Sequence, residues 1–100
     1  MIVKIHKSNE GRVILAVCDS ELIGKRFTEG EKQLDMSSDF YKGEEMEEKR
    51  ILNLLKSVHI VNLCGKESVA LGVKAGVVDE ENIIKVDGIP HAEGVILREE

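Results

Sequence analysis

Six consecutive apolar residues, Val-Ile-Leu-Ala-Val-Cys at positions 13–18, constrain the fold of this 100-residue chain more than its other segments do. A strand that is apolar on both faces has no side to turn toward water, so it belongs in the interior of a sheet. In the preceding segment, 2–7, apolar and polar side chains alternate, which indicates a strand with one wet face. Asn and Gly in the intervening segment, 8–11, suit a tight turn. We therefore expect a β-hairpin whose second strand is internal.

Two helices are predicted in the second half of the chain. Within segment 44–57, apolar residues repeat at helical spacing from Ile51 to Val58 and form a single stripe. Glutamates crowd the start of this segment, where the helix dipole favours negative charge. A second helix is expected at about 66–75, where Gly76 is placed to adopt the left-handed conformation that ends many helices.

The remaining elements are shorter. Strands are expected at 59–64 and 83–86, with a last extended piece at 95–97. Short strands around 22–23 and 33–36 are weaker predictions, and 37–43 is expected to be loop. This order predicts a single domain, residues 1–100, of the α+β class: a two-layer sandwich in which two helices pack on one face of a mixed β-sheet. A parallel crossover from 59–64 through the second helix to 83–86 fits within it.

Composition limits the class of function. Apolar residues make up 42% of the chain and charged residues 33%, as in a folded globular protein, and only three residues are Phe, Trp or Tyr, so the core must be aliphatic. The 14 Lys and Arg against 19 Asp and Glu give a net charge of −5. Proteins that neutralise many phosphates usually carry a basic excess. Global charge therefore argues against broad nucleic-acid binding, although a local basic patch stays possible.

The two cysteines indicate the compartment. Cys18 and Cys64 lie 46 positions apart and form no CxxC pair, so they do not suggest a disulfide scaffold. The N-terminal apolar segment is too short for a signal peptide. No apolar run approaches the roughly 18–20 residues that a membrane span requires. We expect a cytoplasmic protein that does not span a membrane, with both thiols reduced.

The candidate catalytic and metal-binding motifs are weak. Gly65-Lys66 lies between a strand and a helix but lacks the rest of a phosphate-binding loop. Cys18, His59, Cys64 and His91 have the ligand chemistry of a zinc site. However, His59 and Cys64 are separated by an odd number of positions on one strand and should point to opposite faces. We expect no catalytic residue, no metal and no cofactor, and the question of an enzyme stays open, leaning against one.

Two segments are candidates for binding. Segment 24–30 places Lys25 and Arg26 beside Phe27 between glycines, and such a combination can contact phosphate and stack on a base. The alternative is an edge strand whose cations prevent aggregation while Phe27 packs inward. Segment 88–94 contains Pro90 and His91; the proline suits an ordered loop or a sheet edge, and we expect His91 to be exposed there. A loop that only anchors the last strand explains it equally well.

Four stretches together resemble a known family: 18–27, 33–36 leading to Phe40-Tyr41, Asn62-Leu63-Cys64-Gly65, and 88–92. Their order and spacing resemble the small archaeal family called domain of unknown function 424, over nearly the whole chain. Cys64 departs from the Val expected at that position in the family, which further weakens a ligand role for it. The resemblance implies a stand-alone, intracellular, two-layer α+β protein without an assigned activity. It also implies a gene that lies near translation and ribosome-assembly genes, which is an association and not a mechanism.

Three hypotheses follow from these observations. The first is a non-catalytic adaptor that binds RNA or a translation-related protein: Lys25 and Arg26 contact phosphate, Phe27 or Tyr41 stacks, and His91 lines the same surface. The second is an enzyme or small-molecule-binding protein with a pocket near His91 and Cys18. The third is a ligand-free homodimer that pairs through a sheet edge.

Overall fold

The computed structural model describes residues 1–97. These residues form eight strands, two α-helices and three short 3₁₀ helices. The strands are β1 (Ile2–Lys7), β2 (Val13–Cys18), β3 (Arg26–Glu29), β4 (Lys32–Asp35), β5 (Glu44–Glu45), β6 (Ile60–Cys64), β7 (Ile84–Val86) and β8 (Ile89–Val95). The helices are α1 (Glu48–Leu54) and α2 (Lys66–Lys74), with the 3₁₀ helices η1 (Ser20–Leu22), η2 (Asp39–Tyr41) and η3 (Glu80–Asn82).

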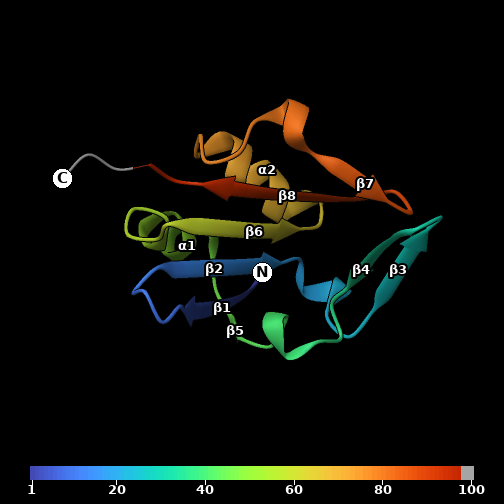
Figure 1. Cartoon of the computed structure of the whole chain (residues 1–100), viewed down its shortest axis with the longest axis horizontal. Helices are drawn as coiled ribbons and strands as arrows, with labels where there is room; N and C mark the ends of the chain where they lie inside the picture. The colour runs from blue at the N-terminus through green and yellow to red at the C-terminus, as the bar shows by residue number, and fades with distance from the viewer. Residues whose placement is uncertain (98–100) are drawn as a thin grey trace.

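Six strands form one mixed sheet in the order β5-β1-β2-β6-β8-β7. Only the β2–β6 pair within it is parallel; the other neighbouring pairs are antiparallel. Both α-helices lie on one face of this sheet, behind it in Figure 1. The α+β sandwich predicted from the sequence, with a mixed sheet and two helices on one face, is therefore confirmed. Within residues 1–97 no helix has the length and apolar character needed to cross a membrane.

The sheet separates two apolar cores. Alternate residues of β2 and β6 point to the helices, and the others point to the opposite face. The helix-side core contains Leu15, Val17, Val61 and Leu63 from the strands with Ile51 and Leu55 from the first helical region. The core on the opposite face contains Ala16, Cys18 and Cys64 from the strands, covered by Leu34, Met36 and Tyr41. Residues 13–18 are internal and apolar because both of their faces are covered, as predicted.

The β3–β4 hairpin forms a separate two-stranded sheet. In Figure 1 it extends from the end of the main sheet toward the β7–β8 turn. The backbone N–H of Asp87, in that turn, donates a hydrogen bond to Glu29 Oε1 at 2.8 Å. The strand expected at 33–36 is therefore present as β4, one residue earlier, whereas 22–23 is not a strand: its partner in the hairpin is β3. The tip of the hairpin contacts the β7–β8 turn.

The first helix begins four residues later than predicted. Glu44 and Glu45 pair with Ile2 and Val3 of β1, so they form an edge strand and not a helical turn. The Glu45 carboxylate also accepts a hydrogen bond from Ser20 Oγ at 2.6 Å and forms an ion pair with the N-terminal amino group. These distant contacts explain the glutamates at 44 and 45 better than the helix dipole does.

The largest error concerns segment 88–94, which is strand and not loop. Except for Gly88, which belongs to the β7–β8 turn, it lies within β8, between β6 and β7, so the expected strand at 95–97 begins six residues too late. Pro90 is tolerated because of its position. Gly65 N–H donates to Pro90 O at 2.9 Å, while Gly65 O already accepts from Val69 N–H at 3.0 Å as α2 begins. The missing N–H of Pro90 therefore leaves no strand acceptor unpaired.

The crossover from β6 through α2 to β7 exists, but the two strands are not neighbours. β8 pairs antiparallel with both of them and lies between them. The prediction that β6 and β7 run parallel is thus correct, but they are not adjacent in the sheet.

Candidate functional site

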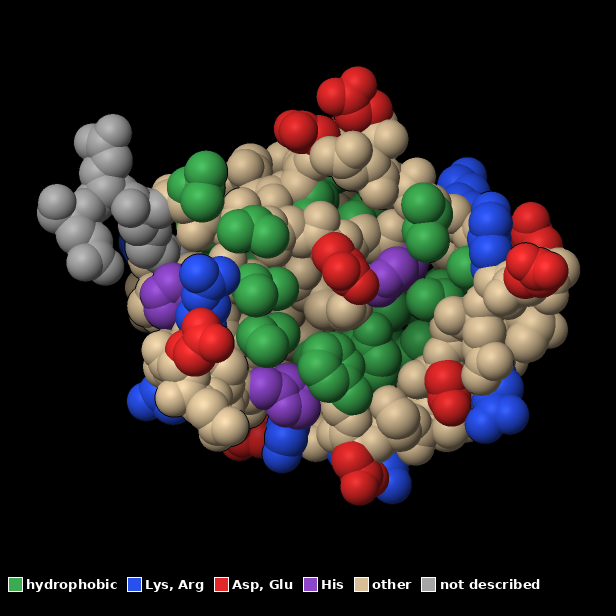
Figure 2. All heavy atoms as spheres, in the orientation of Figure 1, with side chains coloured by type: hydrophobic (Ala, Val, Ile, Leu, Met, Phe, Trp, Pro, Cys, Tyr) green, Lys and Arg blue, Asp and Glu red, His purple; other side chains and the backbone are tan. Residues whose placement is uncertain are grey.

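The face of the six-stranded sheet opposite the helices, called here the open face, is partly uncovered. Figure 2 looks onto it, and apolar side chains lie across its middle beside a hollow. Partly or fully exposed apolar residues belong to this face or pack at its border, among them Ile14, Phe27, Phe40, Ile60, Ile84 and Val95. Ile84 is 48% exposed and Val95 65%. A sheet face that only meets water usually carries polar side chains at such positions.

An aromatic stack borders the open face. The rings of His6 and Phe40 are stacked with centroids 4.4 Å apart and an interplanar angle of 9°. The edge of the next ring, Tyr41, meets Phe40 at 5.0 Å and 82°. His6 Nε2 also lies 2.9 Å from Phe40 O. These contacts hold η2 against β1 and place Phe40 at the border of the open face.

A polar cluster lies on the same face. Tyr41 O–H donates to Asn62 Oδ1 at 2.6 Å, and its oxygen is 3.1 Å from Cys64 Sγ. Cys64 Sγ is in turn 3.2 Å from His91 Nδ1, which also lies 3.0 Å from Leu63 O. Because a carbonyl only accepts, we assign the Nδ1 proton to the hydrogen bond with Leu63 O.

Glu93 completes this cluster at its exposed end. Its Oε1 accepts a hydrogen bond from Asn62 Nδ2 at 3.2 Å and lies 3.4 Å from His91 Nε2. The Glu93 side chain is 66% exposed, whereas that of His91 is 13% exposed. The cluster therefore presents one carboxylate to solvent and keeps its thiol, phenol and imidazole inside.

The Cys64–His91 contact has the residue types of a nucleophile and its base, but its environment opposes that chemistry. Cys64 is fully buried. Burial raises the pKa of the Cys64 thiol to about 11, even though the Tyr41 hydroxyl acts in the opposite direction. Burial, with the neighbouring Cys64 and Asp19, raises the pKa of Cys18 to about 12. Neither thiol is ionised at neutral pH, and a thiolate is the reactive form. The geometry describes a packed hydrogen-bonded cluster.

The structure brings three of the five sequence-predicted binding residues to the open face. Phe27 is half-buried against the core of that face. Tyr41 is 8% exposed, which leaves little of its ring for stacking on a base. His91, expected to be exposed, is instead a strand residue whose side chain is mostly buried. His91 is paired with Cys64 of β6, and Cys18 lies in β2, on the other side of β6. The two residues around which a pocket was predicted are therefore separated by one strand.

The two predicted cations lie on the hairpin. Lys25 and Arg26 are exposed, and Arg26 Nη2 is 3.2 Å from Asp35 Oδ2, so part of its charge is neutralised. Sequence reasoning missed Phe40 and the Asn62–Glu93 pair. One signal was available for Asn62: a polar residue in the middle of an otherwise apolar strand points to a partner on the same face.

The start of α2, where a phosphate was considered, is already occupied by a carboxylate. Asp19 Oδ2 accepts from Glu67 N–H at 3.0 Å, and Oδ1 accepts from Ser68 N–H at 2.8 Å and Ser68 Oγ at 2.7 Å. Glu21 lies near Asp19 and Glu67, with carboxylate oxygens of all three within 4.8 Å of one another. Because both oxygens of Asp19 accept hydrogen bonds from the start of α2, the Asp19 carboxylate acts as a helix cap.

Comparison with known proteins is consistent with this description. The chain is similar to a crystal structure of an uncharacterized conserved protein from Methanopyrus kandleri, at 29% sequence identity and a TM-score of 0.80. The match covers 99% of this chain and 93% of the other. No curated protein matches the chain. A family model described as "Protein of unknown function (DUF424)" matches residues 6–97, and the chain belongs to this family.

Proposed function

We propose that this protein is a non-catalytic adaptor that binds another protein through its open face. The observation that supports this is the group of exposed apolar side chains at sheet positions where a solvated face would be polar. Exposed apolar patches bordered by polar groups are typical of protein–protein interaction sites. The buried thiols, with pKa values raised to about 11 and 12, oppose a catalytic alternative at this face.

A protein partner fits this face better than RNA. Stacking needs accessible rings and phosphate binding needs free cations. Tyr41 is buried, and Arg26 is paired with Asp35. The charge that projects from the polar cluster is the Glu93 carboxylate, and the whole chain carries a net charge of −5. The complementary partner is a protein with an apolar patch bordered by basic side chains. An association with translation remains part of the proposal, and ribosomal proteins are the first candidates.

Pairing of two copies through a sheet edge is less well supported. The edges of the six-stranded sheet are β5, with two residues, and β7, with three. Short edge strands offer few unpaired backbone groups to a second chain. The β3–β4 hairpin also lies against the end of β7 through the Asp87–Glu29 hydrogen bond.

The test is capture of partners by tagged protein from native lysate of the source cells, with and without nuclease. Wild type is compared with Ile84→Glu/Val95→Glu, which places charge on the open face. Ile5→Glu is a matched control, because Ile5 and Ile84 are both 48% exposed but Ile5 points to the helix side. We expect nuclease-resistant capture of a basic protein that the double variant loses and Ile5→Glu retains. The purified partner must then bind directly.

Two outcomes would contradict the proposal. If nuclease abolishes capture while the open-face variant binds normally, the partner is RNA and binds elsewhere. If light scattering shows a wild-type dimer that Ile84→Glu/Val95→Glu converts to a monomer, the open face binds a second copy of this chain.

A further inference from the structure

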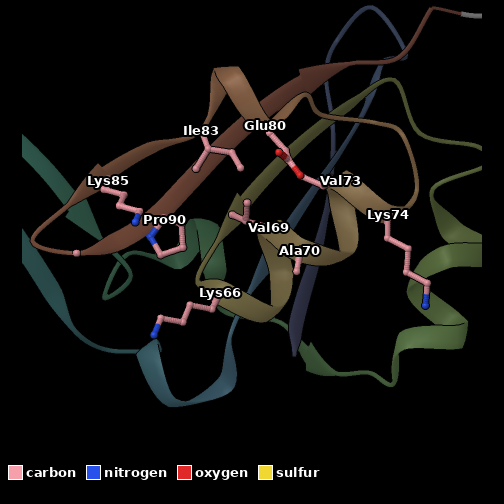
Figure 3. A pocket seen from close by; sticks show the side chains of 10 residues that line it. Lys66, Val69, Ala70, Val73, Lys74, Glu80, Ile83, Lys85 and Pro90 are labelled. Atoms are coloured by element: carbon pink, nitrogen blue, oxygen red, sulfur yellow. The ribbon is translucent and has the colours of Figure 1, made fainter.

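A groove on the helix side of the sheet is separate from the open face. It lies between α2, η3 and the β7–β8 hairpin and has a volume of about 680 Å³ (Figure 3). Its floor is apolar and includes Val69, Val73, Ile83 and Pro90. This volume lies within the range of roughly 300–1,000 Å³ that is usual for small-molecule sites.

Positive charge is concentrated at one end of this groove. Lys66, the first residue of α2, and Lys85, in β7, lie on the side of the groove near Pro90 in Figure 3. Both are exposed, and within residues 1–97 neither forms a salt bridge. Their charges come from two different elements and meet the same groove.

The other charges of the groove are arranged differently. Lys74 Nζ turns toward α1 and lies 3.5 Å from Glu48 Oε1, so its charge is partly neutralised. Glu80 extends from η3 between Ile83 and Val73, away from Lys66 and Lys85 (Figure 3). The groove is therefore polarised: two free cations lie at one end, and apolar side chains with a single carboxylate line the rest.

We propose that this groove binds a small amphipathic anion, namely a phosphate monoester of a hydrocarbon chain. The phosphate lies between the Lys66 and Lys85 ammonium groups, and the hydrocarbon lies over Val69, Val73 and Ile83. A phosphate monoester carries about −1.5 to −2 charges at neutral pH, which two lysines balance, whereas a single carboxylate balances only one. Lysine binds phosphate as a point charge and needs no fixed fork geometry.

The amides at the start of α2 do not take part in this site. Asp19 already accepts the N–H groups of Glu67 and Ser68. The head group is therefore recognised by side chains. Affinity should depend on both lysines and decrease with added salt, because exposed charges are screened over about 8–10 Å at 0.1–0.15 M ionic strength.

The experiment is an NMR titration of ¹⁵N-labelled full-length protein with octyl phosphate below its micellar concentration. Inorganic phosphate supplies the head alone, octanol the chain alone, and octyltrimethylammonium the opposite charge. We expect saturable shifts confined to amides of 66–74 and 83–90, with octyl phosphate binding at least ten-fold more tightly than each of the other three compounds.

Variants test the two halves of the site. Lys66→Ala/Lys85→Ala should weaken octyl phosphate binding at least ten-fold, and Ala70→Phe, which places a ring on the groove wall, should block it. Lys7→Ala/Lys32→Ala is the matched control, since it removes two exposed lysines elsewhere and should bind as wild type. Preserved amide spectra show that each variant is folded.

Three results would overturn the proposal. The first is a titration without saturation or with shifts outside the groove. The second is equal weakening by both double-lysine variants, which indicates a general charge effect. The third is tighter binding of a short acidic peptide than of octyl phosphate in the same groove, which would assign it to a protein segment.

Discussion

Asp19 and Ser68, 49 positions apart, are joined by two hydrogen bonds to one oxygen: Asp19 Oδ1 accepts from Ser68 N–H at 2.8 Å and from Ser68 Oγ at 2.7 Å. Both residues are buried, with 2% and 0% of their surface exposed. The contact connects the end of β2 to the start of α2, across the β2–β6 parallel pair. A side chain outside the helix therefore performs the function that a local N-cap residue usually performs.

The first prediction is that Asp19→Ala destabilises the protein by about 2–4 kcal/mol. Removal of the carboxylate leaves the N–H groups of Glu67 and Ser68 and the Ser68 hydroxyl without their acceptor, and hydrogen bonds to charged groups contribute about 1.5–3 kcal/mol. Urea unfolding followed by circular dichroism measures the change. Glu21→Ala, two positions away and exposed, should change the free energy of unfolding by less than about 0.5 kcal/mol. A loss for Asp19→Ala as small as that for Glu21→Ala would show that the cap contributes little to stability.

The second prediction concerns Gly65, which precedes α2 with φ at 104°. A Cβ built there lies 2.2 Å from Asp19 Cγ, so Gly65→Ala combines backbone strain with a clash against the cap and should cost more than about 2 kcal/mol. Gly76→Ala is the matched control. Its φ is 74°, but nothing lies within 4 Å of the new Cβ, so only strain of roughly 1–2 kcal/mol is expected.

The clash and the strain can be separated by a double-mutant cycle. In an Asp19→Ala background the side chain that opposes the new Cβ is absent, so Gly65→Ala should be less destabilising than in the wild type. A cost that is identical in both backgrounds would assign the whole effect to the positive φ.

Local patterns predicted the elements whose burial is regular along the chain. The apolar segment 13–18 and the alternation in 2–7 identified the central hairpin, and the stripe ending at Val58 identified the first helix. The start of that helix was missed because Glu44 and Glu45 pair with β1, a contact 41–43 positions away in sequence that no local pattern encodes. The β8 strand was missed because it contains Pro90. That proline is tolerated only because it lies opposite Gly65, where β6 ends and α2 begins, and this pairing is not visible in the local sequence.

The candidate site was predictable only in part. Phe27, Tyr41 and His91 were singled out by residue type, and all three lie on the open face. Their exposure was not predictable, since it depends on which strands the β3–β4 hairpin and η2 cover. The open face itself appears only when the six strands are ordered, because its apolar residues come from separate strands that look individually like core.

The third prediction is a loss of stability at alkaline pH. The folded-state pKa of Cys64 is raised from 9.0 to about 11 and that of Cys18 to about 12. The folded state thus binds more protons than the unfolded state between these values, and stability falls as pH rises. The contribution is fully present below about pH 9 and is lost as pH rises through 11–12. For Cys64 it amounts to roughly 2–3 kcal/mol at about 1.4 kcal/mol per pKa unit.

Urea unfolding at intervals from pH 8 to pH 10.5 measures this slope. Cys18→Ala/Cys64→Ala should flatten it, while Tyr41, whose pKa is also raised by burial, leaves a residual slope above about pH 10. Iodoacetamide should modify both thiols of native protein far more slowly than those of urea-unfolded protein at pH 8. Rapid modification of Cys64 in the native state would instead indicate an accessible, ionised thiol and would revive the enzyme hypothesis.

The fourth prediction is that Tyr41→Phe lowers the free energy of unfolding by about 1–2 kcal/mol. The variant keeps the buried ring and removes the hydroxyl that bonds to Asn62 Oδ1 and Cys64 Sγ, so it isolates the polar part of the cluster. Chemical denaturation gives the value, and Phe40→Tyr serves as a control because that ring is already half-exposed. An unchanged stability for Tyr41→Phe would mean that water replaces the hydroxyl without loss.

The fifth prediction separates binding from stability on the open face. Glu93→Gln keeps an oxygen that can accept the Asn62 Nδ2 hydrogen bond but removes the charge, so stability should stay within about 0.5 kcal/mol of wild type. If the partner is a protein with basic side chains around its apolar patch, the same change should slow association several-fold and reduce its salt dependence, because charge complementarity acts mainly on the association rate. Surface plasmon resonance with the purified partner at two salt concentrations measures both, with Glu31→Gln on the β3–β4 turn as the control. Faster association of Glu93→Gln would show that the partner's patch is acidic, and the basic chemistry proposed for it would have to be abandoned.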